Sequence, residues 1–255
     1  MRGQRAGDKR RVFALLRPIL AYALPPRCAG CGTPVEADGS FCARCWSGLR
    51  FIGPPWCAGC HLPFDYDAGT TVRCAACLAR PPRHAGVSAA VAYGDTARAL
   101  ALGLKYGGRL GVATTVAGLM QRHLPSDAEL IVPVPLHRSR LWQRGFNQAV
   151  LICKALARSA DVPISPDALL RTRRTPALKG MNGHERVRAV CGAFAVAPRR
   201  AASITGRRVV LVDDVYTSGA TVAGCTDVLL AAGAARVSVL CWARVLDERG
   251  SAERD

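Results

Sequence analysis

Residues 209–221 read VVLVDDVYTSGAT, and this stretch decides the fold. Its four leading apolar residues predict a strand that is buried on both faces, as the central strands of parallel sheets are. The two acids that follow, Asp213 and Asp214, then stand at the carboxyl edge of the sheet, where open α/β folds bind their ligands. One short segment therefore predicts both a parallel α/β sheet and the place of its binding site.

The residues after the acids form a loop directly before a predicted helix. Its hydroxyl groups and the backbone amide of its glycine can approach an anion, and the helix N-terminus adds partial positive charge. The acid pair suits the vicinal hydroxyls of a ribose, with any Mg²⁺ shared between ligand and water. The alternative is an acidic turn in which Thr217 or Ser218 caps the helix. The expected phosphoribosyl-binding residues are Asp213, Asp214, Thr217, Ser218, Gly219, Ala220 and Thr221.

From about Val87 onward, short β-branched runs alternate with longer helical patterns. This order is typical of strand-helix-strand units, so we expect a doubly wound α/β domain with a parallel sheet flanked by helices. The expected strands are 89–93, 130–134, 208–212 and 236–241, and the expected helices are 96–104, 110–122, 148–158 and 221–232.

Cysteine is concentrated near the start of the chain, where eight of the twelve cysteines form four Cys-x-x-Cys pairs between residues 28 and 77. Because zinc takes four thiolates in a tetrahedron, two pairs close one structural site. The knuckle pattern repeats along the chain, which predicts two tandem ribbons of one design. His61 and His84 are expected to be surface or capping residues rather than ligands. The simplest pairing is sequential, with Cys28, Cys31, Cys42 and Cys45 on one zinc and Cys57, Cys60, Cys74 and Cys77 on the other.

Two alternatives to that arrangement stay open, an interleaved pairing and a redox dithiol. Paired cysteines in a chain without an export signal indicate a reducing compartment, so we expect a cytoplasmic protein. No stretch is long and apolar enough to span a bilayer.

The chain is strongly basic, with 35 Lys and Arg against 18 Asp and Glu and a net charge of +17. Such a balance favours contact with polyanions, either nucleic acid or phosphorylated ligands. The alternative is an Arg-rich composition that carries no nucleic-acid footprint.

A basic loop is expected at residues 137–144, after the second strand. Arginine forks bind phosphate oxygens in bidentate fashion, and such a loop can hold pyrophosphate opposite residues 217–221. Exposed aromatic side chains beside arginines also suit single-stranded DNA, and a solvated surface loop is the alternative to both. Residues 171–188 are expected to form a mobile flap. The residues expected to bind pyrophosphate or DNA are Lys105, Arg109, Arg138, Arg140, Arg144 and Trp142.

Residues 209–221 resemble the 5-phosphoribosyl-1-pyrophosphate binding motif of type I phosphoribosyltransferases, with apolar residues, two acids and a Thr-Ser-Gly-x-Thr loop in order. Residues 104–109 (LKYGGR) and 132–148 (VPVPLHRSRLWQRGFNQ) resemble the ComF family of ComFC-like and GntX-like proteins, which carry a Cys-rich zinc module in front. The resemblance implies a type I phosphoribosyltransferase-like domain behind a double zinc ribbon. In the flap the chain departs from the family pattern, because Leu178, Met181 and Ala189 stand where that pattern has Gln, Leu and Asn.

We therefore expect a basic amphipathic helix at 1–27, a double zinc ribbon at 28–82, a phosphoribosyltransferase-like domain at 83–247 and a polar tail at 248–255. The family resemblance implies binding of phosphoribosyl pyrophosphate or ribose phosphate with Mg²⁺. It also implies help in natural transformation through handling or import of single-stranded DNA, together with DNA-uptake machinery. The alternatives are a regulator that senses phosphoribosyl pyrophosphate and an active transferase, whose expected catalytic residues are Asp213, Asp214 and Lys105.

Overall fold

The computed structural model describes residues 25–67, 69–106, 110–173, 185, 188 and 190–246. Several expectations lie outside these residues, namely most of the N-terminal helix, Arg109, most of the flap and the polar tail. In the described parts, no helix is both long and apolar enough to cross a membrane.

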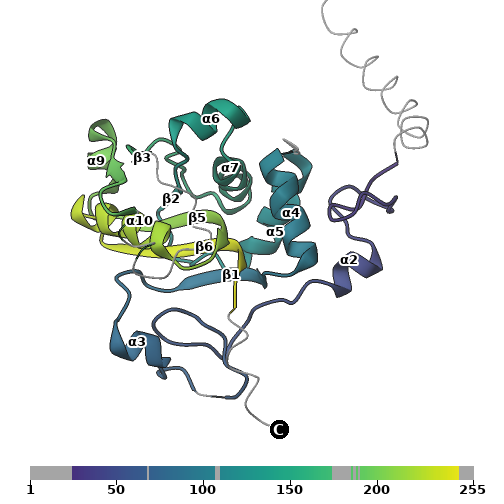
Figure 1. Cartoon of the computed structure of the whole chain (residues 1–255), viewed down its shortest axis with the longest axis horizontal. Helices are drawn as coiled ribbons and strands as arrows, with labels where there is room; N and C mark the ends of the chain where they lie inside the picture. Colours follow the sequence, from purple (N-terminus) through teal and green to yellow (C-terminus); the bar gives the residue numbers. More distant parts are fainter. Residues whose placement is uncertain are drawn as a thin grey trace, which may run out of the picture.

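The centre of the fold is a four-stranded parallel sheet with the strand order β1-β6-β5-β2 (Figure 1). All four of its strands were predicted from the runs of β-branched and apolar residues. The last two run further than predicted, so that Asp213 and Asp214 lie within β5 rather than beyond its end. The strands are β1 (Val87–Ala92), β2 (Leu130–Pro133), β5 (Arg208–Tyr216) and β6 (Arg236–Arg244).

Helices cover both faces of this sheet, which confirms the doubly wound class. One buried cluster joins α4, α5 and α7 to one face of the sheet through Val210, Val212 and Leu240. The other joins α9 and α10 to the opposite face through Val209 and Leu211. The bounds are α4 (Asp95–Tyr106), α5 (Leu110–Gln121), α7 (Gln148–Ala160), α9 (Ala201–Ile204) with the 3-10 turn Pro198–Arg200 before it, and α10 (Ala220–Ala231).

Other features of the domain also differ from the sequence prediction. Residues 138–144 form a helix, α6 (Arg138–Arg144), where a basic loop was expected. His137 caps this helix by accepting a hydrogen bond from the Ser139 amide, and Gly145 ends it in the left-handed conformation. The flap expected at residues 171–188 falls between the two strands of an antiparallel pair, β3 (Leu169–Arg171) and β4 (Phe194–Val196), which were not predicted from the sequence.

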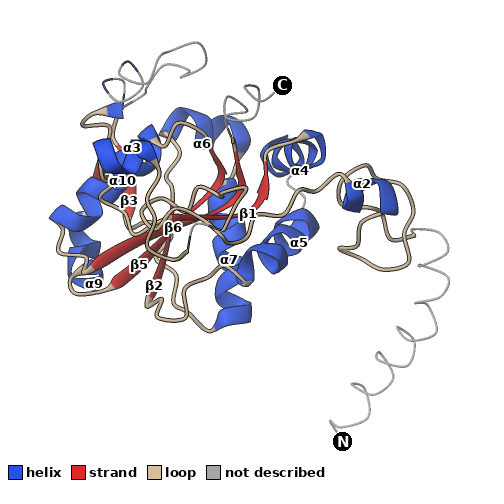
Figure 2. Ribbon diagram, turned by 90° about the horizontal axis from the view of Figure 1, so that it is seen from below, coloured by secondary structure: helices blue, strands red, loops and turns tan. Residues whose placement is uncertain are grey.

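The two ribbons have the same hydrogen-bond pattern. In the first, the Cys28 amide donates to the Thr33 carbonyl, and in the second the Cys57 amide donates to the Leu62 carbonyl. A short helix follows the third cysteine of each ribbon, and the two helices lie at opposite ends of β1 (Figures 1 and 2). The predicted tandem design is therefore present, with helices α2 (Ala43–Ser47) and α3 (Ala75–Ala79).

The segment between the ribbons is part of the sheet edge. The Ile52 amide donates to the Ala90 carbonyl at 3.1 Å, and the Ala92 amide donates to the Arg50 carbonyl at 2.8 Å. Leu49 and Ile52 are buried in the two core clusters on either side of the sheet. The segment that connects the two ribbons therefore pairs with β1, in addition to the direct chain connection from the second ribbon into that strand.

Asn147 explains why helix α7 starts where it does. Its side-chain oxygen accepts a hydrogen bond from the Ala149 amide at 2.9 Å, which caps the helix. Its side-chain nitrogen donates to the Val134 carbonyl at 3.0 Å, just past the end of β2. One side chain therefore fixes the first turn of α7 against the sheet edge that carries the site.

We predict that Asn147→Ala lowers the free energy of unfolding by about 1 to 2 kcal/mol, because it removes a cap and leaves a carbonyl without its donor. Asn147→Asp keeps the cap and loses only the donor, so its effect should be smaller. Urea unfolding followed by circular dichroism measures both, with the exposed Gln143→Ala as the control. Equal stability of Asn147→Ala and Gln143→Ala would contradict the assignment.

Candidate functional site

The acid pair lies at the end of β5, with Asp214 buried and Asp213 half-buried. The Asp213 carboxylate accepts a hydrogen bond from the Asp214 amide at 2.8 Å, and Lys105 Nζ lies 2.8 Å from Asp214 Oδ2. Burial raises the pKa of Asp213 well above its usual range, the negative charge of Asp214 adds to this, and Lys105 opposes it. Among the described residues, Lys105 is therefore the cation that pairs directly with this largely buried acid pair.

Three helices converge on Asp214. Gln148, the first residue of α7, donates a long hydrogen bond to Asp214 Oδ1 at 3.5 Å. Arg144 at the end of α6 donates to the Gln148 side-chain oxygen at 3.3 Å and stacks over the ring of Tyr106, whose centroid is 5.5 Å away. The sequence analysis missed Gln148 and Tyr106, although both belong to the stretches that carry the family resemblance.

Helix α4 brings Lys105 to this point because its inner face is tightly packed. Leu100 and Leu104 are fully buried, and the indole nitrogen of Trp242 on β6 donates to the Ala97 carbonyl at 3.1 Å. Trp242 is itself fully buried. The position of Lys105 in the last turn of α4 is thus set by the core.

Residues 217–221, the predicted phosphate loop, lead from β5 into α10 through Gly219. This residue is the N-cap of α10 at φ +74, and no side chain in the described chain caps the helix. The alternative with Thr217 or Ser218 as the cap is therefore wrong, and both residues are exposed. A Cβ at position 219 would collide with the hydroxyl of Tyr216, so only glycine fits here. The first amides of α10 face the loop, as an anion site requires.

The expected basic residues divide into two groups. Lys105 and Arg144 turn inward to the Asp214 network, as described above, whereas Arg138 and Arg140 are exposed on α6. Trp142, on the same helix, is 93% exposed. A cavity of about 730 Å³ is lined by apolar residues that include Leu141, Phe146 and Leu170 and by charged residues that include Arg138 and Lys154.

The eight ribbon cysteines gather in sequential order, so the interleaved pairing is wrong. Within each set the four sulfur atoms lie within 4.8 Å of one another. The Cys31 and Cys42 sulfurs are 3.6 Å apart, and those of Cys60 and Cys74 are 3.8 Å apart. Zinc-sulfur bonds of about 2.3 Å in a tetrahedron place sulfurs about 3.8 Å apart, so both sets fit the ion. The two four-cysteine sites are Cys28, Cys31, Cys42 and Cys45, and Cys57, Cys60, Cys74 and Cys77.

A backbone amide donates to the first sulfur of each set. The Cys42 amide donates to the Cys28 sulfur at 3.3 Å, and the Cys74 amide donates to the Cys57 sulfur at 3.2 Å. Burial opposes ionisation of Cys57, but the amides of Cys74, Cys60 and Gly59 outweigh it and lower its pKa to about 6. Thiolates stabilised in this way are the form that binds the metal.

His61 and His84 belong to neither sulfur cluster, as expected. Neither is fully exposed, and His84 Nδ1 accepts a hydrogen bond from the Gly86 amide at 3.2 Å, which is a capping role. His61 stacks on Trp56 with ring centroids 4.9 Å apart, and its Nδ1 lies 3.1 Å from the Ser88 hydroxyl on β1. His84 is buried, and burial followed by the charge of Arg244 lowers its pKa to about 4. Both residues pack where the second ribbon meets the sheet.

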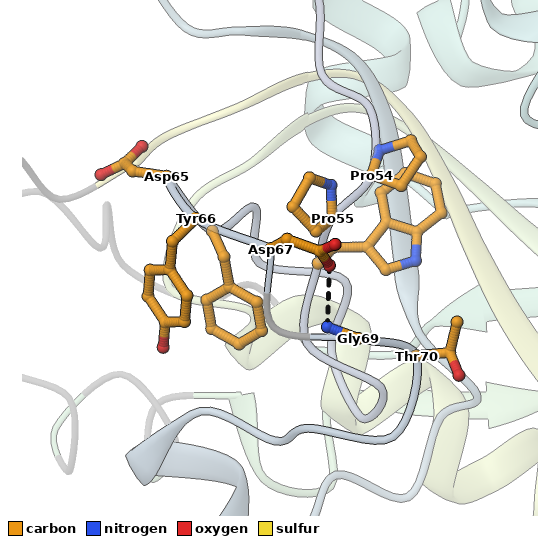
Figure 3. A pocket seen from close by; sticks show the side chains of 9 residues that line it. Pro54, Pro55, Asp65, Tyr66, Asp67, Gly69 and Thr70 are labelled. Atoms are coloured by element: carbon orange, nitrogen blue, oxygen red, sulfur yellow. Dashed lines mark hydrogen bonds between the residues drawn. The ribbon is translucent and has the colours of Figure 1, made fainter.

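A further cavity, of about 590 Å³, lies on the second ribbon (Figure 3). Tyr66 and Phe64 stack there with centroids 5.5 Å apart, and Asp67 accepts a hydrogen bond from the Gly69 amide at 3.0 Å. The described residues that line it include Asp65 and Asp67 but no Lys or Arg. Its charge therefore does not suit a phosphate.

Both parts of the chain match known protein families. Residues 19–78 match the double zinc ribbon domain, and residues 147–254 match the phosphoribosyl transferase domain. The DNA utilization protein YhgH of Escherichia coli K12 is 34% identical over 178 residues, which cover 67% of this chain and 77% of that protein. The Competence protein F of Haemophilus influenzae is 35% identical over 46% of this chain and 50% of its own length. The Competence protein ComFC of Bacillus subtilis is 33% identical over 38% of this chain and 36% of its own length.

We predict that the purified protein holds about two zinc ions per chain, because each set of four cysteines offers a complete tetrahedral shell. Cys57→Ser should lower this to about one, since the first ribbon keeps its own four sulfurs. Elemental analysis by mass spectrometry measures the content. Cys191→Ser is the matched control, because Cys191 is exposed and lies outside both sets. A wild-type protein without zinc would contradict the assignment.

Proposed function

This chain belongs to the ComF family of competence-related proteins with a phosphoribosyltransferase domain, and on that premise we propose that it binds a 5-phosphoribosyl ligand at the end of β5 and handles single-stranded DNA in the cytoplasm. In this role the protein assists natural transformation and has the DNA-uptake machinery as its partner. Relatives named for DNA utilization and competence support this direction. Reduced zinc sites made of cysteine also suit the cytoplasm, where thiols stay reduced.

The main support for this ligand is that the acid pair Asp213 and Asp214 lies close along the chain to a helix N-terminus without a side-chain cap. Asp213 and Asp214 accept hydrogen bonds from the ribose hydroxyls, while residues 217–221 and the first amides of α10 receive the 5-phosphate. Lys105, with Arg109 close to it in sequence, supplies positive charge for a pyrophosphate group. Mg²⁺ is held jointly by ligand oxygens, water and the acid pair, and it offsets the phosphate charge when bound.

The main support for DNA handling comes from the exposed side chains of α6. Trp142 offers a fully accessible ring on which a base can stack, and Arg138 and Arg140 lie on the same short helix. Aromatic stacking combined with arginine contacts to the backbone is the usual arrangement of single-strand binding proteins. The net charge of +17 supports the same ligand class.

Two other functions use the same phosphoribosyl site. In an active transferase, a base nitrogen would form the bond to ribose C1 as pyrophosphate leaves with the bonding electrons and the base proton passes to solvent. In a regulator, phosphoribosyl pyrophosphate would bind without turnover. The titration described next separates these functions, because only the transferase releases pyrophosphate.

We predict that Asp213→Asn and Asp214→Asn each weaken the binding of phosphoribosyl pyrophosphate roughly 10- to 100-fold. Each substitution replaces a charged acceptor by a neutral amide of similar shape. Calorimetric titration with Mg²⁺, with pyrophosphate release followed in parallel, makes the measurement. Asp227→Asn is the control, because Asp227 pairs with Arg83 on the exposed side of α10. Wild-type affinity in both acid variants would place the ligand elsewhere.

The same titration decides between turnover and binding. Pyrophosphate release that depends on an added base would establish a transferase. Binding without release is the outcome that our proposal expects, and it would also fit a regulator. The DNA experiment below separates those two functions.

We predict that Trp142→Ala weakens binding of a single-stranded oligonucleotide roughly 5- to 100-fold, the range expected for losing one stacked base. Replacing Arg138 and Arg140 by Gln should lower the slope of log affinity against log salt by about 1.4, which corresponds to two lost phosphate contacts. Fluorescence anisotropy over a salt series measures both. Tyr66→Ala, which removes an exposed ring beside two aspartates, is the control and should bind as the wild type does. Unchanged affinity of Trp142→Ala would exclude α6 as the binding face.

A further inference from the structure

Arg244 is a buried cation at the join between the second ribbon and the sheet. It is the last residue of β6, it is 5% exposed, and it pairs with Tyr216 in the register of β5 and β6. In the described part of the chain no carboxylate lies within ion-pair distance of it. A buried arginine requires a compensating negative group, so its actual neighbours matter.

Those neighbours belong to the second zinc site. Arg244 Nη1 donates to the Cys60 carbonyl at 2.7 Å and, more weakly, to the Val87 carbonyl at 3.3 Å. Its Nη2 lies 3.8 Å from the Cys60 sulfur. Four thiolates around one Zn²⁺ leave two negative charges, so the loaded site supplies the counter-charge that Arg244 lacks elsewhere.

The other side of Arg244 faces the phosphate loop. Its guanidinium carbon stands 5.1 Å from the centre of the Tyr216 ring. The Tyr216 hydroxyl in turn lies directly against Gly219, where it would meet any added Cβ. The chain of contacts therefore runs from a zinc ligand through Arg244 and Tyr216 to the residue at which α10 begins.

The first ribbon has no equivalent contact among the described residues. Its sulfurs contact Thr33, other cysteines and backbone amides. Arg27 donates to the Gly32 carbonyl, but this bond is exposed. The second ribbon also departs from the first at the knuckle, where His61 takes the left-handed conformation that Gly32 takes in the first. In this conformation the His61 ring stacks on Trp56 and its Nδ1 contacts the Ser88 hydroxyl on β1, so that this ribbon packs against the strand.

We propose that Arg244 is a positioning residue that couples the second zinc site to the phosphate loop through Tyr216. Loss of zinc from this site weakens binding of the phosphoribosyl ligand, and by thermodynamic reciprocity the bound ligand raises the affinity of the site for zinc. We expect this higher affinity to be expressed as slower release of that zinc. The first site is uncoupled. The coupling rests on the proposed function, because its ligand is the phosphoribosyl ligand proposed there. The role of Arg244 as counter-charge to the zinc site does not depend on that function.

The test follows zinc release from the intact protein to a chromogenic chelator, with and without phosphoribosyl pyrophosphate. In the wild type we expect two phases, one of which the ligand slows. Arg244→Met should speed that phase roughly tenfold or more without ligand, the size of effect seen when a neighbour of a metal ligand is lost. In this variant the ligand should no longer change the rate. Arg236→Met is the matched control, because Arg236 lies on the same strand but is exposed and pairs with Asp127.

Two more variants separate coupling from simple loss of structure. Arg244→Lys keeps the charge without the planar fork, so its release rate should fall between those of wild type and Arg244→Met. Tyr216→Leu should release zinc at the wild-type rate without ligand, yet lose the slowing by ligand. If Arg244→Met does not fold, Tyr216→Leu carries the test alone.

The proposal is overturned if Arg244→Met releases zinc as Arg236→Met does, or if ligand slows release equally in Tyr216→Leu and wild type. If the wild-type protein binds no phosphoribosyl pyrophosphate by calorimetry, the proposed function fails and the coupling fails with it. In that case the release rate of Arg244→Met without ligand still decides whether Arg244 is the counter-charge of the second zinc site.

Discussion

The ion pair between Lys105 and Asp214 is the interaction on which the site depends. Two adjacent carboxylates at the end of a buried strand would be costly to desolvate, and a cation at 2.8 Å offsets part of that cost. Lys105 reaches this point only because α4 is packed on the sheet through Trp242. The long hydrogen bond from Gln148 then draws α7, and through Arg144 also α6, to the same carboxylate. Helices from three parts of the chain are therefore arranged around one charge.

A similar constraint governs the ribbons, where buried thiolates take the place of a hydrophobic core. Their helices have five residues each, and the buried side chain in each helix is a cysteine, Cys45 or Cys77. So small a module cannot bury enough apolar surface to fold on that basis, and a structural metal supplies the missing stability. The second ribbon adds contacts to the sheet through Cys60 and His61. For this reason its metal and the domain share an interface.

The sequence predicted most of the sheet because apolar and β-branched runs mark strands that are buried on both faces. It placed the end of β5 too early, because aspartates are poor strand formers, while pairing with β6 extends the strand as far as Tyr216. Helix α6 was missed for another reason. It buries none of its residues, so it has no apolar periodicity to read. The contact between Arg244 and Cys60 joins positions 184 residues apart, which no local pattern encodes.

The basic residues show most clearly that composition alone does not give the role of each charge. A net charge of +17 predicts a polyanionic partner in general, yet the basic residues serve different ends. Lys105 and Arg244 act inside the molecule, one against a carboxylate and the other beside a thiolate site. Arg138 and Arg140 remain exposed. Because an inward cation stabilises the fold and an outward one is free to meet phosphate, the position of each charge decides its role, and the excess of charge alone does not.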